Sequence, residues 1–125
     1  MRATRVIEIS DKMAKEVVEA ISPRLGCDHT DAPEYPEGRK DVCAVRCTVE
    51  NGSTYGYDII YVLWSRPKTG EIVFKKIASS EDTKDYVFIR SVAVEPHEIL
   101  VVTIGSMGGL SGKPWERTER VPLRF

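Results

Sequence analysis

Three cysteines and two neighbouring side chains form the first group of residues that could do chemistry. Cys27, His29 and Asp31 lie in one short stretch, and Cys43 and Cys47 follow. Thiolate and imidazole are preferred zinc ligands. The spacing does not match the C-x-x-C knuckle, and on a strand Cys43 and Cys47 would lie about 13 Å apart, too far for one tetrahedral centre. We therefore expect no metal and no cofactor, and we interpret Cys43 and Cys47 as small core residues.

A second group combines aromatic rings with cations on what read as neighbouring strands. Bases of single-stranded nucleic acid stack on such rings while cations follow the phosphates. Its members are Tyr55, Tyr57, Tyr61, Trp64, Arg66, Phe74, Lys75, Lys76 and Arg90. The alternative is that the strand aromatics are core residues. The chain as a whole also lacks the excess of positive charge that is typical of a nucleic-acid-binding protein.

Catalytic motifs are not present in the sequence. Neither a G-x-S-x-G elbow nor an H-E-x-x-H helix occurs. His97 falls between two expected strands, where an exposed turn residue is the simpler interpretation. A glycine-rich segment ends in Gly112-Lys113, but Met107 replaces the first glycine of a phosphate loop and Pro114 replaces its hydroxyl residue. We expect a hinge there and no catalytic residues.

One amphipathic helix is expected near the N-terminus. Ser10 offers a hydroxyl cap, and Asp11 complements the helix dipole. Apolar residues then recur at helical spacing as far as Ile21, and Pro23 ends the pattern. The short β-branched stretch Thr4 to Ile9 reads as a first strand.

After a long acidic connection, Ser22 to Asp41, the pattern becomes that of β-strands. Five β-branched or aromatic runs follow, namely Val42 to Val49, Tyr55 to Trp64, Glu71 to Ala78, Tyr86 to Glu95 and Ile99 to Ile104. Asn51-Gly52 is a strong hairpin signal, and short connections favour antiparallel pairing. The predicted fold is α+β: an antiparallel meander of about five strands with the helix packed on one face.

The last twenty-one residues differ in character from the rest. We expect residues 1–104 to form one α+β domain and residues 105–125 a glycine-hinged C-terminal arm. Val121, Leu123 and Phe125 alternate with polar residues and Pro122, which suits an edge strand because proline cannot donate to an inner ladder. These three apolar residues are predicted to anchor the arm, on its own sheet or on that of a neighbouring copy.

Several of the expected strands are apolar on both faces, most clearly Tyr55 to Trp64. One short helix covers only one face of a five-stranded sheet. The other face must be covered by strong, barrel-like curling of the sheet, by the long loop and the arm, or by a partner chain. A second copy is the simplest partner, so we expect a homodimer or a larger homo-oligomer.

Composition narrows the class of protein further. The 125 residues carry a net charge of −1, so there is no long-range attraction to nucleic acid or anionic lipid. Glutamine is absent and Asn51 is the only asparagine, a pattern of hyperthermophile proteins. No apolar run suits a membrane span or a signal peptide, which predicts the cytoplasm. The odd number of cysteines argues against a fully paired framework, while a thermophilic source leaves one cystine open.

These observations together predict a small non-enzymatic binding or assembly module of a thermophile that associates with itself. A protein that binds single-stranded nucleic acid through the aromatic and basic strand residues is the alternative. A small metal-dependent enzyme is the third interpretation.

Overall fold

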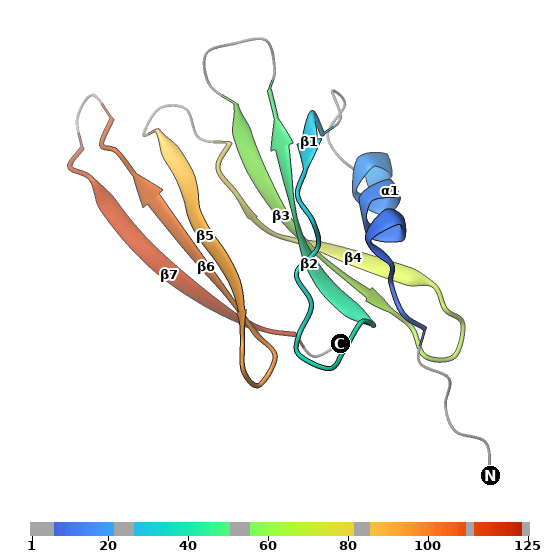
Figure 1. The fold of residues 1–125 in the computed structure, drawn as a ribbon. Helices are drawn as coiled ribbons and strands as arrows, with labels where there is room; N and C mark the ends of the chain where they lie inside the picture. The colour runs from blue at the N-terminus through green and yellow to red at the C-terminus, as the bar shows by residue number, and fades with distance from the viewer. Residues whose placement is uncertain (1–6, 22–26, 51–55, 82–85, 110–111, 124–125) are drawn as a thin grey trace.

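The computed structural model describes residues 7–21, 27–50, 56–81, 86–109 and 112–123. Its elements are α1 (Asp11–Ile21), β1 (His29–Thr30), β2 (Val42–Val49), β3 (Tyr57–Ser65), β4 (Ile72–Ser79), β5 (Val87–Glu95), β6 (Ile99–Ser106) and β7 (Trp115–Pro122). The strands form two antiparallel sheets, one in the order β1-β2-β3-β4 and one in the order β5-β6-β7. The helix packs on one face of the first sheet, and the second sheet lies on the opposite face of the first sheet (Figure 1).

Helix α1 begins where the sequence predicted. The Ser10 hydroxyl accepts a hydrogen bond from the Met13 amide at 3.1 Å, which satisfies one of the free N–H groups of the first turn. Ala14 and Val18 are fully buried against the first sheet. Residues 4–6 of the predicted first strand lie outside the described residues, and the residues from position 7 to the helix are not in a strand.

The two central strands of the first sheet separate two apolar cores. Alternate residues of β2 and β3 point to opposite faces, because side chains of a strand alternate with a period of two. The first core, between α1 and the sheet, contains Cys43, Val45, Cys47, Val49, Tyr57, Ile59, Tyr61 and Leu63. The second core, between the sheets, contains Val42, Ala44, Ile60 and Val62 with Ile89, Leu100, Val102, Ile104 and Leu123.

The antiparallel pairing and the helix packed on one face are confirmed, but the prediction of a single meander of about five strands is wrong. In the described residues, seven strands divide into a four-stranded and a three-stranded sheet, and these sheets do not close into a barrel. The chain leaves the first sheet after β4, and β5 begins the second. The physical reason is the two-sided apolar character of β2 and β3: the second sheet covers the face that the helix leaves open.

The long acidic connection runs along the edge of β2. The amides of Asp28 and Asp31 donate to carbonyls of β2, and residue 34 forms an isolated antiparallel bridge with Ala44. The Tyr35 hydroxyl lies 2.7 Å from the Ile9 carbonyl oxygen, so the connection also contacts the segment before α1. Its described residues are therefore held by backbone pairing, which the absence of a local periodicity did not indicate.

Candidate functional site

The three cysteines lie in or against the first core. Cys27 and Cys47 form a disulfide that joins the start of the acidic connection to β2. Cys43 is a free thiol with no exposed surface, and burial raises its pKa to about 12. A thiol with so high a pKa is protonated at neutral pH and is neither a nucleophile nor a ready metal ligand.

The candidate metal ligands of the acidic connection do not converge. Cys27 is in the disulfide, while the His29 Nε2 and Asp31 Oδ1 atoms form an exposed pair at 2.8 Å. Within the described ranges no group of three histidine, cysteine or acidic side chains is placed to hold a metal ion.

The predicted aromatic and basic platform is divided among separate surfaces. Tyr57 and Tyr61 are buried beneath α1, whereas Trp64 packs against the second core on the opposite face. Arg66, Lys75 and Lys76 are exposed at or beside β4, Phe74 is 46% exposed on β4, and Arg90 lies in the other sheet. Tyr55 is outside the described residues. No continuous stacking surface is formed by the described members of this group.

The predicted anchors of the arm pack within their own chain. Leu123 is fully buried in the second core, and Val121 packs against that core from β7. Phe125 lies outside the described residues. The described part of the arm is thus an integral strand of the second sheet.

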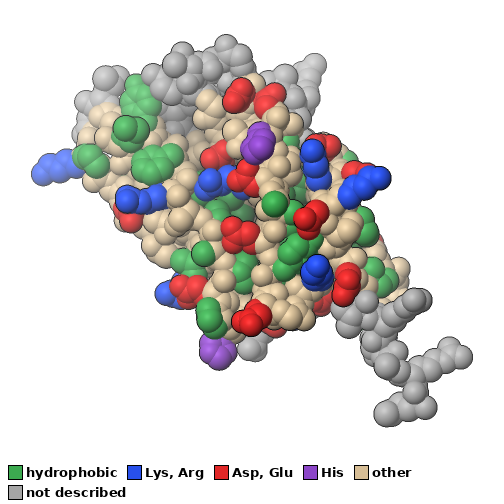
Figure 2. Space-filling view, viewed as in Figure 1, with side chains coloured by type: hydrophobic (Ala, Val, Ile, Leu, Met, Phe, Trp, Pro, Cys, Tyr) green, Lys and Arg blue, Asp and Glu red, His purple; other side chains and the backbone are tan. Residues whose placement is uncertain are grey.

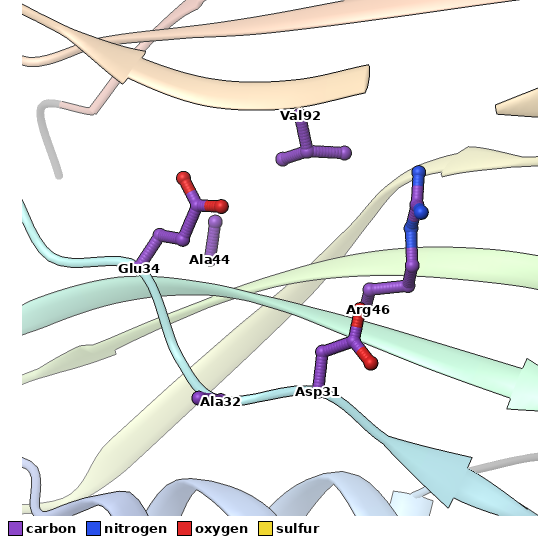
Figure 3. Close-up of a pocket in the computed structure, with 6 residues that line it drawn as sticks. All are labelled: Asp31, Ala32, Glu34, Ala44, Arg46 and Val92. Carbon is purple, nitrogen blue, oxygen red and sulfur yellow. The ribbon is translucent and has the colours of Figure 1, made fainter. Parts of the chain in front are cut away.

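Arg46 bridges the two sheets beside a small cavity. Figure 3 shows its side chain pointing from β2 toward β5, with Val92 across the space. Its guanidinium donates to the carbonyl of Ile89 at 3.1 Å, and its Nε atom lies 4.0 Å from the Asp58 carboxylate. Asp31 and Glu34 also line this cavity, which has a volume of about 80 Å³. It has room for a few water molecules only, and we assign Arg46 a structural role between the sheets.

A second ion-pair cluster joins the layers near the β5–β6 turn. Arg39 donates to Asp41 at 2.8 and 2.7 Å and also to Glu98, which lies in that turn. Glu98 has a positive φ of 60°, and the preceding His97 has a φ of 68°. Residues other than glycine rarely adopt this left-handed backbone conformation. The hydrogen bonds from Arg39 lower the pKa of the Asp41 carboxyl.

This cluster predicts acid-sensitive stability. Because the pKa of Asp41 is lowered in the folded protein, its stabilisation is complete above its unfolded value of about 3.8 and is lost as pH falls through the folded value. We expect Arg39→Gln to reduce the free energy of unfolding by about 1 kcal/mol at neutral pH and by much less near pH 2. Urea denaturation across this range measures it, and a pH-independent difference between the two proteins would contradict it.

The most distinctive surface of the molecule is an apolar end of the second sheet, which we call the aromatic end. It consists of Tyr86, Phe88, Met107 and Trp115, with exposed fractions of 38%, 36%, 72% and 38%. The start of β5, the end of β6 and the start of β7 meet there because the three strands are antiparallel. These strand ends lie at the upper left in Figure 1, and hydrophobic side chains gather over the same region in Figure 2.

The aromatic end surrounds an open hollow of about 490 Å³. Its lining is formed by Phe88, Arg90, Ser106, Met107, Pro114, Trp115 and Glu116. Gly105 of β6 leaves room for the end of the Phe88 ring, because a Cβ atom at that position would lie 2.7 Å from the ring Cζ atom. The glycine thus fixes one wall of the hollow.

Two arginines beside the hollow, Arg90 and Arg117, already have partners. Arg90 pairs with Glu116 at 2.8 Å, and Arg117 pairs with Glu119 at 3.2 Å. The Arg117 guanidinium also lies 5.3 Å from the centre of the Trp115 ring, a cation–π distance. The surface is therefore apolar and close to neutral rather than basic.

Sequence reasoning included Arg90 but missed the four apolar residues of the aromatic end. The sequence pattern predicts that Tyr86 and Phe88 belong to an ordinary strand, and that Met107 and Trp115 belong to the hinge and the arm. A local signal existed: a methionine and a tryptophan flank the glycine-rich segment, where a buried position is not expected. Their assembly at one end depends on the pairing of β5, β6 and β7.

Comparison with known proteins does not identify the chain. No family model, no curated protein and no solved structure matches it. Among the described residues, no helix has the length and apolar character needed to cross a membrane.

Proposed function

We propose that the protein is a non-enzymatic protein-binding module whose contact surface is the aromatic end. The observation that carries this proposal is the joint exposure of Phe88, Met107 and Trp115 around an open hollow. Aromatic residues, methionine and arginine are enriched at protein interfaces, and contiguous exposed apolar patches mark interaction sites.

A nucleic-acid ligand has weaker support. Binding of a phosphate backbone requires available positive charge, whereas Arg90 and Arg117 are each paired with a glutamate. Stacking requires accessible ring faces, yet Tyr57 and Tyr61 are only 8% and 5% exposed. A metal-dependent enzyme has weaker support still, because Cys27 is in a disulfide and the Cys43 thiol is buried and protonated.

The proposal predicts that polar substitution of the aromatic end abolishes partner binding without unfolding the protein. The test compares proteins retained from an extract of the source organism by the immobilised wild-type chain and by a Phe88→Ser/Met107→Ser variant. We expect at least about a tenfold loss of specific partners, since central apolar contacts supply most of the binding energy of an interface.

Phe74→Ser is the matched control, because Phe74 is an equally large exposed ring on β4 of the other sheet. It should retain the same partners as the wild-type chain. Equal retention by all three proteins would refute the aromatic end as the binding surface.

The nucleic-acid alternative is tested with the same surface. Trp64→Phe leaves Trp115 as the only tryptophan of the chain, so its fluorescence reports on the aromatic end. We expect no quenching by a thymine oligonucleotide at low salt. Quenching that weakens with added salt would favour the nucleic-acid alternative over a protein partner.

A further inference from the structure

Strand β7 leaves one edge of the second sheet open. In the part of the chain that the structure describes, β7 pairs with β6 on one side and has no strand on the other. It is the outermost strand at the left in Figure 1. An open edge presents a row of backbone N–H and C=O groups that can pair with another strand.

The register shows which residues face this open edge. The Leu123 amide donates to the Glu98 carbonyl at 2.8 Å, in line with the pairing of Pro122 with Ile99. Because N–H and C=O groups alternate sides along an antiparallel strand, Leu123 and every second residue before it point toward β6. Pro122 and the residues in step with it, Arg120, Thr118 and Glu116, point outward.

The sequence of β7 is self-complementary about Thr118. Arg117 and Glu119, the two neighbours of Thr118, have opposite charges. Glu116 and Arg120, which lie two residues from Thr118 on either side, also have opposite charges. The following pair, Trp115 and Val121, is apolar. Opposite charges directly across two strands stabilise their pairing, and like charges destabilise it.

We propose that a second copy of this chain pairs antiparallel with the open edge of β7, with Thr118 opposite the Thr118 of the second copy. Glu116, Thr118 and Arg120 of both copies then supply about six backbone hydrogen bonds. The residues just beyond this pairing are Pro114 and Pro122, which also stand opposite each other. Neither has an N–H group, so the ladder ends at both sides.

The charges already on the outer face fit this dimer. Within one chain Arg90 pairs with Glu116 at 2.8 Å and Glu95 pairs with Arg120 at 2.5 Å. Pairing places Glu116 of each copy opposite Arg120 of the other. The two separate ion pairs then join into a row of alternating sign that crosses the boundary between the copies.

Other registers lack this complementarity. If the centre moves by one residue, Arg117 faces the Arg117 of the second copy or Glu119 faces the Glu119 of the second copy. Like charges then face each other. Only the register centred on Thr118 pairs every charged residue of β7 with the opposite sign. The strand therefore selects one partner, a second copy, and one alignment.

The first test of the dimer measures its mass and removes one backbone hydrogen-bond donor from the open edge of β7. Light scattering of the wild-type chain at about 50 μM should give twice the mass of one chain. Thr118→Pro removes an N–H group that β6 does not use, so the variant should keep its fold while the dimer dissociation constant rises at least about tenfold. A wild-type monomer up to about 100 μM would overturn the proposal.

The charge pattern supplies a second, independent test. Arg117→Glu places like charges opposite each other and should raise the dimer dissociation constant by at least about tenfold. Arg117→Glu/Glu119→Arg restores both the pair within the chain and the pair between copies, so it should restore the dimer. Arg66→Glu, which breaks an exposed pair beside β4, is the control and should not change the mass. A dimer insensitive to Thr118→Pro and Arg117→Glu would overturn the proposal.

These outcomes are separable from those of the proposed function. Phe88→Ser/Met107→Ser should lose the protein partners and keep the dimer mass, because neither residue lies on β7. Thr118→Pro should lose the dimer and keep its retention of partners.

Discussion

Reduction of the disulfide is expected to lower the free energy of unfolding of this protein by about 3 kcal/mol. Cys27 and Cys47 are separated by 20 residues, and cross-linking a loop of this size removes that much entropy from the unfolded chain. The effect corresponds to a drop of roughly 10 °C in melting temperature. Chemical denaturation with and without a thiol reductant measures it.

A Cys27→Ala/Cys47→Ala variant provides the comparison. It should be less stable than the oxidised wild-type chain by a similar amount or more, because Cys47 is also fully buried, and it should not respond to reductant. Cys43→Ala, which removes the free buried thiol and keeps the disulfide, should still respond. Equal stability of the wild-type chain in oxidant and reductant would show that this bond contributes nothing.

Truncation of Leu123 is the second change with a large expected effect. Leu123 has no exposed surface and packs between the sheets with Leu100 and Val102. Leu123→Ala should therefore destabilise the protein by about 2.5–5 kcal/mol, through lost burial and the cavity left behind. Thermal or urea unfolding of the variant measures the loss.

The nearby Val121→Ala substitution is the control for this prediction. Val121 is only partly buried on β7, so its truncation should cost clearly less. A loss below about 1 kcal/mol for Leu123→Ala would mean that the end of the chain does not contribute to the core. It would then be a dispensable arm rather than part of the second sheet.

The two proposed surfaces together describe an assembly module with two identical binding ends. Antiparallel pairing of β7 with its copy turns the two aromatic ends in opposite directions, since each lies at the start of β7. Such a dimer would connect two partner molecules, and its avidity would exceed that of one chain. The wild-type dimer should accordingly bind more tightly to a dense surface of immobilised partner than to a sparse one, whereas a Thr118→Pro monomer should bind equally to both.

The elements whose signals are local were predictable from the sequence. The Ser10 cap and the helical spacing up to Ile21 determine α1, because capping and amphipathic periodicity act within a few residues. The alternation of β2 and β3, with the Asn51-Gly52 turn signal between them, predicts an antiparallel pair but not its register. A two-residue Asn-Gly turn would place Val49 opposite Thr54, whereas Val49 pairs with Tyr57. The two apolar faces of β3 also implied a second covering layer.

Only the tertiary structure decided what that layer is. Pairing of β5 with β6 and β7, rather than with β4, depends on contacts between residues far apart in the sequence, such as Ile60 with the second core. The tertiary structure likewise selects Cys27 and Cys47 for the disulfide through the pairing of β1 with β2, because cysteine spacing does not reveal which strand edge the acidic connection follows. It also decides that Phe88 and Trp115 meet at one exposed end and that β7 keeps an open edge, since both depend on which strands are neighbours.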